Sequence, residues 1–107
     1  MIFLVICGKI IYKVHKMISE ATLNKISGIL KAEGCKEIFL FGSHANGHAN
    51  ENSDIDIGIR GLDPSKFFSV YARLDNELSE KIDFVDFDDQ ADFFTFLSGI
   101  GELQKIG

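Results

Sequence analysis

The sequence predicts an α/β domain, because segments with helical periodicity alternate along the chain with short apolar runs typical of strands. The chain has 107 residues, of which 46% are apolar and ten are phenylalanine. This length and composition suit one hydrophobic core of ordinary size and leave little room for a second, substrate-binding domain. We therefore expect residues 17–107 to form a single domain.

The first predicted element is a helix that starts at Ser19, a residue type that often caps helix N-termini. Its apolar positions follow at intervals of three and four residues: Leu23, Ile26 and Leu30. Gly34 marks its end, since glycine readily adopts the left-handed conformation that follows a last helical turn. We expect this helix to pack against a strand at residues 37–41.

That strand is followed by a turn of small and polar residues. Residues 38–41 are wholly apolar, and the run stops abruptly at Gly42 and Ser43, which open a stretch rich in glycine, asparagine and histidine. Small residues after a buried strand let the backbone come close to a ligand, so this turn could cradle phosphate. We expect its two histidines, His44 and His48, to be solvated loop residues.

The next strand carries two carboxylates on one face. Isoleucines alternate there with Asp54, Asp56 and Gly58, and the strand period of two places the carboxylates together on the side opposite the isoleucines. Two like charges about 7 Å apart along a strand repel each other unless a cation lies between them, and carboxylate oxygens suit magnesium. A lone Asp-x-Asp is more often a solvated strand face, but the preceding Gly-Ser turn favours a metal site.

A second helix and a third strand are predicted next. Asp63 and Pro64 form a cap and a first-turn proline. The apolar residues of this helix follow at intervals of three and four: Phe67, Tyr71, Leu74 and Leu78. Residues 82–87 then have the composition of a strand, and we expect Asp88 or Asp89 to cap a last amphipathic helix. The large apolar residues of that helix are expected in the core: Phe93, Phe94, Phe96 and Leu97.

Two aspartates of the third strand compete for a functional role. Asp83 shares a strand face with Val85 and Phe87, and Asp86 lies on the other face. An aspartate on an apolar face is costly unless it is paired or bound to a metal. This cost favours Asp83 as a third carboxylate of the site and leaves Asp86 as its rival.

The spacing of these residues resembles that of the nucleotidyltransferase superfamily that includes DNA polymerase beta, and in particular its small stand-alone branch, the minimal nucleotidyltransferases. Their pattern is Gly-Ser, a spacer, Asp-x-Asp, and a third carboxylate on a later strand. The resemblance extends over residues 18–100. In this chain the pattern falls on Gly42, Ser43, Asp54, Asp56 and Asp83.

The resemblance implies a nucleotidyltransferase fold, with a small mixed sheet flanked by helices, and an enzyme that transfers AMP from ATP to a hydroxyl with release of pyrophosphate. Asp54, Asp56 and Asp83 would hold two magnesium ions, and Asp83 would also act as the general base. Gly42 would let the backbone approach the triphosphate. Ser43 would offer its hydroxyl and amide to the phosphates at the start of a short helix, whose N-terminus favours anions.

One position departs from the family pattern. Members usually carry arginine or lysine three residues after the motif serine, whereas this chain carries Asn46. An amide can donate hydrogen bonds to a phosphate but has no charge, so nucleotide binding at this position would be weaker. Three cations elsewhere could replace the missing charge: Arg60, Arg73 and Lys81.

Minimal nucleotidyltransferases with this spacing resemble the antitoxins of toxin–antitoxin pairs whose toxin is a HEPN-family RNase. In that setting they transfer AMP to tyrosines of the toxin, so the resemblance implies a protein adenylyltransferase and a HEPN-type partner. A partner that supplies the acceptor suits a chain with no acceptor-binding domain. Two alternatives stay open: an antitoxin that neutralises its partner by binding alone, and a transferase that acts on a small-molecule hydroxyl.

Charge and cysteine content argue against several other classes. The net charge is -5, and no long run of lysine or arginine is present. Polymer nucleic acid is therefore a poor candidate ligand, because its binding depends on cationic contacts that release counterions. The two cysteines, Cys7 and Cys35, are too few for a disulfide framework and form no zinc-binding pattern. We expect a cytoplasmic protein.

The N-terminal segment has a different character from the rest. Residues 2–7 are apolar but too few to span a bilayer, and no basic region precedes them as in a secretory signal, so we expect no membrane attachment. Met17 opens the segment where minimal nucleotidyltransferases usually begin. Residues 1–16 are therefore expected to be an added element or an upstream mis-start, and residues 2–7, if ordered, an edge strand or an interface strip.

Overall fold

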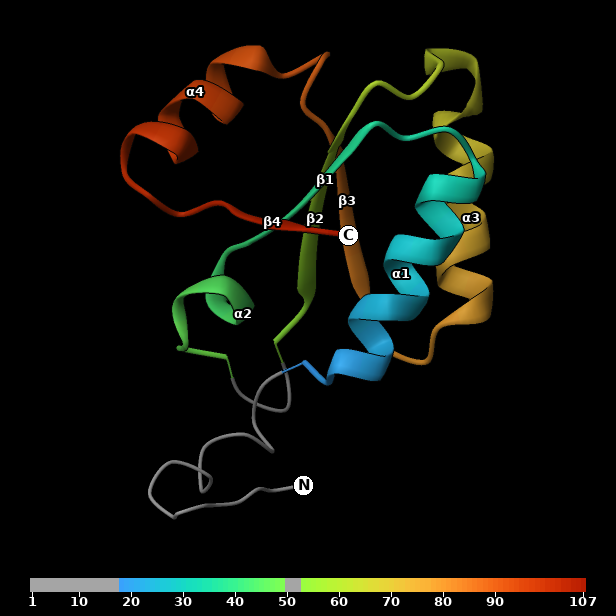
Figure 1. Cartoon of the computed structure of the whole chain (residues 1–107), viewed down its shortest axis with the longest axis horizontal. Helices are drawn as coiled ribbons and strands as arrows, with labels where there is room; N and C mark the ends of the chain where they lie inside the picture. The colour runs from blue at the N-terminus through green and yellow to red at the C-terminus, as the bar shows by residue number, and fades with distance from the viewer. Residues whose placement is uncertain (1–17, 50–52) are drawn as a thin grey trace.

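The computed structural model of the chain describes residues 18–49 and 53–107, which form a four-stranded sheet with helices on both faces (Figure 1). The predictions for residues 1–16 lie outside the described residues. The elements in chain order are α1 (Glu20–Ala32), β1 (Glu37–Phe41), α2 (Ser43–Asn46), β2 (Ile55–Arg60), a 3-10 turn (Pro64–Lys66), α3 (Phe67–Glu77), β3 (Ile82–Asp86), α4 (Ala91–Gly99) and β4 (Gln104–Ile106).

The sheet is mixed, as predicted, with the strand order β3-β2-β1-β4. Strand β1 is antiparallel to both β2 and β4, and β2 is parallel to β3. The parallel pair needs a crossover connection, which α3 provides. Strand β4 was not predicted, because its three residues are too few to show a strand period and two of them are exposed at the sheet edge.

The face of the sheet covered by α1 and α3 is mainly aliphatic. The isoleucines of β2 lie on this face and are buried against both helices, as their alternation with polar residues predicted. Phe67 at the start of α3 stacks on Phe84 of β3 with ring centroids 4.9 Å apart. This cluster is the larger of the two hydrophobic cores within the described residues.

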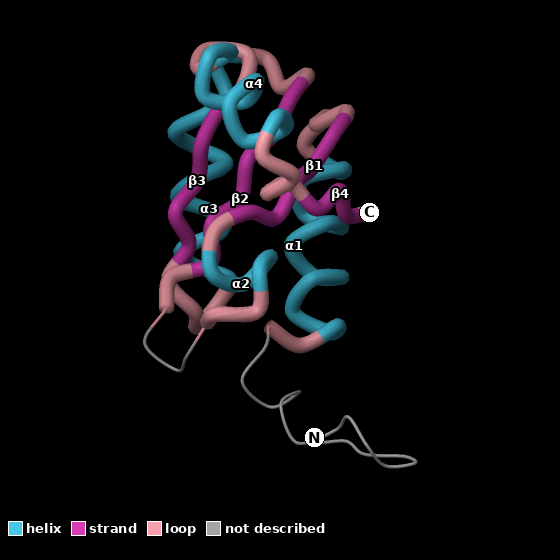
Figure 2. The backbone as a smooth tube through the Cα atoms, turned by 90° about the vertical axis from the view of Figure 1, so that its left-hand side faces the viewer, coloured by secondary structure: helices cyan, strands magenta, loops and turns pink. Residues whose placement is uncertain are grey.

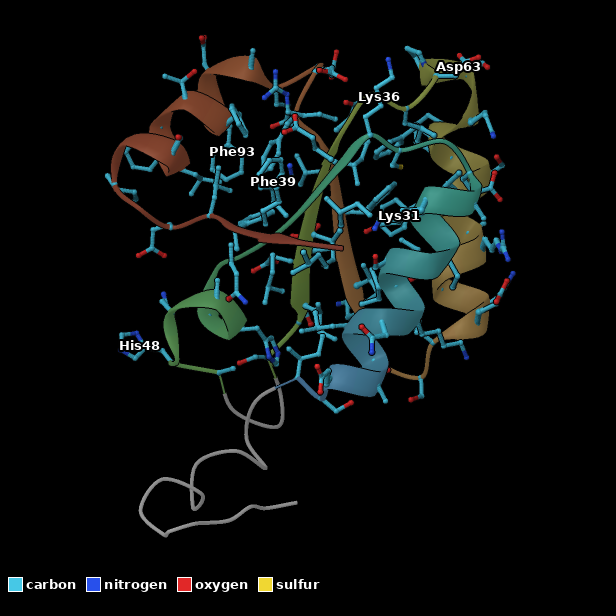
Figure 3. The ribbon with its side chains drawn as sticks, viewed as in Figure 1. Lys31, Lys36, Phe39, His48, Asp63 and Phe93 are labelled. Carbon is cyan, nitrogen blue, oxygen red and sulfur yellow. The ribbon has the colours of Figure 1, made fainter. Side chains whose placement is uncertain are left out.

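The opposite face is aromatic and is covered by α4. Phe39 and Phe41 of β1 pack here with Phe87, Phe94 and Leu97. Figure 3 shows Phe39 and Phe93 in the space between α4 and the sheet. The ring of Phe87 lies directly over Gly58, where any side chain would collide with it. The prediction that the last helix contributes to the core is confirmed for Phe94 and Leu97, whereas Phe93 and Phe96 are exposed.

Two of the predicted helix starts are confirmed. The side chain of Ser19 accepts a hydrogen bond from the backbone N–H of Thr22, and Gly34 follows α1 with a φ of 103°. The side chain of Asp63 accepts from the N–H of Ser65, and a 3-10 turn there precedes α3. Both caps satisfy amides that a helix leaves unpaired in its first turn.

The predicted cap of α4 was wrong. Its N-cap is Gln90, which makes no side-chain cap hydrogen bond. Asp88 is engaged elsewhere, because its carboxylate accepts a hydrogen bond of 2.7 Å from the N–H of Gly61. Asp89 lies in the turn that follows β3, where its own N–H donates to the carbonyl of Asp86.

Helix α2 lies at the end of the sheet where β1 ends and β2 begins (Figure 2). It is one turn long and follows Gly42, in agreement with the predicted short helix. None of the helices in residues 18–49 and 53–107 has both the length and the apolar character needed to cross a membrane.

Candidate functional site

The register of β2 and β3 brings the predicted carboxylates together. Asp56 lies directly opposite Asp83 on the neighbouring parallel strand, so both side chains project from the same face of the sheet. Asp54 is two residues before Asp56 and therefore shares that face. The face is the one covered by α4. The start of β2, which follows Asp54 and contains Asp56, lies near α2 (Figure 2).

The surroundings of Asp56 show that the three carboxylates interact. The pKa of Asp56 is raised to about 6, first by burial and then by the negative charges of Asp83 and Asp54. A hydrogen bond between the Asp56 and Asp83 carboxyl groups raises it further, whereas nearby His44 lowers it. A concentration of negative charge that favours protonation would equally favour a bound cation.

Asp83 shares its strand face with Val85 and Phe87, as predicted, but its side chain is exposed near the start of β3. The burial cost expected for an aspartate on an apolar face is therefore absent. What distinguishes Asp83 is its register opposite Asp56, which cannot be read from the spacing of apolar residues.

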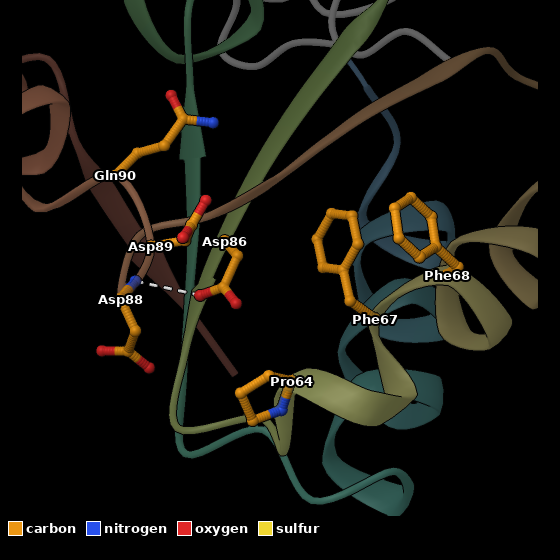
Figure 4. Close-up of a pocket in the computed structure, with 7 residues that line it drawn as sticks. All are labelled: Pro64, Phe67, Phe68, Asp86, Asp88, Asp89 and Gln90. Carbon is orange, nitrogen blue, oxygen red and sulfur yellow. Dashed lines mark hydrogen bonds between the residues drawn. The ribbon is translucent and has the colours of Figure 1, made fainter.

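Asp86 occupies a different place in the fold. It lies opposite Ile59 near the other end of β2, and its carboxylate accepts a hydrogen bond of 2.9 Å from the N–H of Asp88. It lines a cavity of about 400 Å³ together with Phe67 and Phe68 (Figure 4). Asp86 is thus three residues along β3 from Asp83 and on the other face of the strand.

The turn after β1 is in contact with the carboxylates. Phe41, the last residue of β1, lies opposite Asp56, and the chain then turns at Gly42 with a φ of 72°. A side chain at Gly42 would collide with the carboxylate of Asp56. Glycine is therefore required here both by the backbone conformation and by the neighbouring carboxylate, and Ser43 follows as the first residue of α2.

The prediction that His44 is solvated was wrong. His44 is only 7% exposed, and its Nε2 lies 3.4 Å from the carbonyl oxygen of Ser53. Its Nδ1 is buried and has no hydrogen-bond partner in the part of the chain that the structure describes. The small and polar residues of this turn gave no indication of burial, because the contact of His44 with Ser53 joins positions nine residues apart. His48 is exposed, as predicted, and projects outward beyond α2 (Figure 3).

Asn46, the residue that departs from the family pattern, is exposed on α2. Its Nδ2 donates a hydrogen bond of 3.3 Å to Oε1 of Glu102, and its Oδ1 accepts from the N–H of His48. Glu102 belongs to the segment that connects α4 to β4. Sequence reasoning missed this contact, because the two residues are far apart in the chain and β4 was not predicted.

The three candidate replacement cations are placed differently. Arg60 lies over the ring of Phe94, 4.6 Å from its centroid, and pairs with carboxylates near the opposite end of β2. Arg73 lies on α3 and is held by Glu33 and Glu77 at 2.9 Å and 2.6 Å. Lys81 lies beside the site, with its Nζ 3.9 Å from Oδ2 of Asp54.

The donors at this site suit a hard cation, although the carboxylates do not form a closed set of ligands. In the described residues, no group of three or more histidine, cysteine, aspartate or glutamate side chains is arranged to hold a metal ion. Magnesium does not need such a group, because it is usually held by one or two carboxylates, water and the phosphates of a substrate. The oxygen chemistry of Asp54, Asp56 and Asp83 fits that mode of binding.

Comparison with known families gives one match. A family model described as polymerase beta nucleotidyltransferase matches residues 24–99. The matched range contains the Gly42-Ser43 turn and all three grouped carboxylates. No curated protein sequence matches the chain.

Solved structures with the same fold include toxin–antitoxin complexes. One, described as a toxin–antitoxin with AMP-PNP, is 27% identical with a TM-score of 0.62, over 78% of this chain and 70% of that chain. A mutant of the toxin–antitoxin MntA–HpeT is 25% identical with a TM-score of 0.63, over 85% and 73% of the two chains. A structure from Shewanella oneidensis is 16% identical with a TM-score of 0.61, over 84% and 72%, and shows the fold alone.

Proposed function

The chain belongs to the polymerase beta nucleotidyltransferase family, and from this premise we propose that it transfers AMP from ATP to a hydroxyl of a partner protein. The observation that carries the proposal is the register of β2 and β3, which sets Asp56 beside Asp83 with Asp54 on the same face. These carboxylates adjoin the glycine turn that precedes α2. Such an arrangement offers oxygen ligands next to a backbone that a triphosphate can approach.

In this proposal Asp54, Asp56 and Asp83 would hold two magnesium ions. When bound, magnesium neutralises charge on the phosphates and lowers the pKa of the attacking hydroxyl. The raised pKa of Asp56 supports a cation here, because a positive charge would relieve the repulsion from Asp83 and Asp54.

The residues of the chain have separate roles in the transfer. The acceptor oxygen forms a bond to the α-phosphorus, and the bond to the pyrophosphate oxygen breaks. The proton of the acceptor hydroxyl goes to the carboxylate of Asp83, whose exposure lets an acceptor from outside the chain reach it. Gly42 and Ser43 receive the phosphates at the start of α2.

We propose further that the acceptor is a tyrosine of a HEPN-type RNase toxin and that the chain acts as its antitoxin. The support is the similarity to toxin–antitoxin complexes, one of them with AMP-PNP, an analogue of ATP. Phenolic oxygens on a partner surface suit an exposed general base. The alternative is an antitoxin that neutralises its partner by binding alone, and Asn46 in place of the usual cation favours this alternative.

The test compares two isosteric variants, Asp83→Asn and Asp86→Asn, each incubated with the toxin, ATP and magnesium. Mass spectrometry of the toxin should show added AMP with the wild type and with Asp86→Asn, and none with Asp83→Asn, because only Asp83 lies beside Asp56. Each variant should still bind the toxin, since neither residue is in a hydrophobic core. If all three proteins neutralise the toxin equally and its mass never changes, the binding alternative replaces the catalytic proposal.

A further inference from the structure

We propose that Lys81 is the cation that binds the phosphates of the nucleotide, in place of the positive charge that Asn46 lacks. This inference rests on the proposed function, because it assigns a residue to the same site. A triphosphate that approaches Asp54, Asp56 and Asp83 meets three carboxylates, so a nearby positive charge would favour its binding. Of the lysines and arginines whose ion pairs are defined in residues 18–49 and 53–107, Lys81 is the one paired with a carboxylate of this site.

The backbone fixes the position of Lys81. Ile55 lies opposite Ile82, and the N–H of Ile55 donates a hydrogen bond of 2.9 Å to the carbonyl of Lys81. The residues one step earlier, Asp54 and Lys81, are therefore neighbours across the two strands. Because Lys81 is two residues before Asp83, its side chain shares the face of the site carboxylates.

The side chain of Lys81 is also free to change partner. It is 80% exposed, and its Nζ is 3.9 Å from Oδ2 of Asp54, which is itself 43% exposed. An exposed ion pair at such a distance contributes little stability. The flexible stem of a lysine can therefore carry the ammonium from Asp54 to a phosphate oxygen at little cost.

The other candidate groups are committed elsewhere. Arg73 of α3 is held by Glu33, which follows α1, and by Glu77. Arg60 is held near the opposite end of β2 by a phenyl ring and two carboxylates. The amide of Asn46 donates to Glu102. Asn46 therefore offers neither a charge nor a free amide group to a phosphate.

The proposal predicts a charge-specific effect on nucleotide binding. Removing a charge-assisted hydrogen bond to phosphate should weaken ATP binding by at least about tenfold. Adenosine has no phosphate, so its binding should not change. If Lys81 had only a structural role, its substitution would weaken the binding of both ATP and adenosine or lower the melting temperature.

The experiment is isothermal titration of the full chain with ATP and with adenosine, in the presence of magnesium. The variants are Lys81→Gln, Lys81→Arg and the matched control Lys105→Gln, since Lys105 is a 62% exposed lysine paired with Glu37 on the β1–β4 edge. We expect Lys81→Gln to lose at least about tenfold in ATP affinity and to keep its adenosine affinity and melting temperature. Lys81→Arg and Lys105→Gln should each have an ATP affinity within about threefold of that of the wild type. The first puts an arginine beside Asp54, and the second leaves Lys81 there.

Two results would overturn the inference. In the first, Lys81→Gln binds ATP as tightly as the wild type, or its affinity for adenosine falls as much as its affinity for ATP. Lys81 then does not contact phosphate, and the proposed transferase function is unaffected. If the wild type itself does not bind ATP with magnesium, both the inference and the proposed function are wrong.

Discussion

The pKa of Asp56 is raised, and the neighbours of its carboxylate explain why. It is partly buried beneath the α2 turn, faces Asp83 across the sheet and has Asp54 two residues before it. Gly42 leaves it the space that a side chain would fill. A carboxylate in such surroundings binds a proton or a cation more readily than one in water.

The first prediction concerns the pH dependence of stability in the absence of divalent metal. The pKa of Asp56 is about 6 in the folded chain, above its ordinary value of 3.8, so folding favours its protonated form. The stability that protonated Asp56 contributes is therefore complete below the ordinary pKa, and it is lost as the pH rises through about 6. Asp56→Asn cannot ionise, so the melting temperature of the variant minus that of the wild type should be larger at about pH 7.5 than at about pH 4.5.

The measurement is thermal unfolding followed by circular dichroism in buffer with a chelator. The lowered pKa values of Glu33 and Asp63 affect both proteins alike and cancel in the difference. Added magnesium should raise the melting temperature of the wild type at about pH 7.5 and that of Asp56→Asn much less. A difference between the two proteins that does not vary with pH would contradict the role given to Asp56.

At the residue scale the sequence identified the carboxylates but not their surroundings. Alternation placed Asp54 and Asp56 on one face, and the structure agrees. The burial of His44, the contact of Asn46 with Glu102 and the position of Lys81 each depend on chain segments far apart in sequence. Periodicity carries no information on such contacts, because it reports only which side of an element is apolar.

At the scale of elements, Gly58 links β2 to the aromatic core. The ring of Phe87 packs on the bare backbone of Gly58, and this contact holds the segment after β3 against the sheet. The N–H of Phe87 donates a hydrogen bond of 2.9 Å to the carbonyl of Ile59 and continues the parallel pairing past Asp86. The position of β3, and with it that of Asp83, depends on this packing.

The second prediction is that Gly58→Ala destabilises the fold. The added methyl group would collide with the ring of Phe87, and overpacking of this kind costs about 1–3 kcal/mol. Gly28→Ala is the matched control, because Gly28 lies in α1 with open space around it, and alanine there should stabilise by roughly 0.5–1 kcal/mol. Urea unfolding of both variants measures the two effects, and a neutral Gly58→Ala would mean that Phe87 moves aside freely.

Most elements could be predicted because each follows from local chemistry. The caps at Ser19 and Asp63 and the helical spacing of apolar residues fixed α1 and α3 within a few residues. Strand β4 and the start of α4 could not be predicted, because a three-residue edge strand has no period and because Asp88 binds Gly61 instead of capping a helix. The pairing of strands was likewise beyond the sequence, and it is the pairing that assembles the site.

At the scale of the whole molecule, the two faces of the sheet differ in role: one is given over to the hydrophobic core, and the other also carries the candidate site. One face is closed by α1 and α3 over a mainly aliphatic core, and the other is covered by α4 (Figure 1). The second face also carries Asp56 and Asp83, next to the turn that precedes α2. Asp83 is exposed on this second face. This exposure is what the proposed transfer to a partner protein requires, because the acceptor must reach the carboxylate from outside the chain.

The third prediction concerns how the chain meets the proposed toxin. Its net charge is -5, the same sign as RNA. An RNase binds a polyanion through cationic contacts, so an acidic antitoxin should be attracted to the same positive surface. We expect the association rate constant to fall by about tenfold or more between low salt and about 0.5 M NaCl, while the dissociation rate constant changes little, because long-range attraction acts mainly on encounter.

Surface plasmon resonance with the toxin immobilised measures both rate constants over a series of salt concentrations. Single-stranded RNA immobilised in a second channel is the control. The chain should not bind it at any salt concentration, because it is acidic and has no long run of lysine or arginine to contact phosphates. An association rate constant that is independent of salt would mean that apolar surface, not charge, directs the encounter. In that case the exposed apolar residues of α4, Phe96 among them, would become the first positions to substitute in the search for the interface.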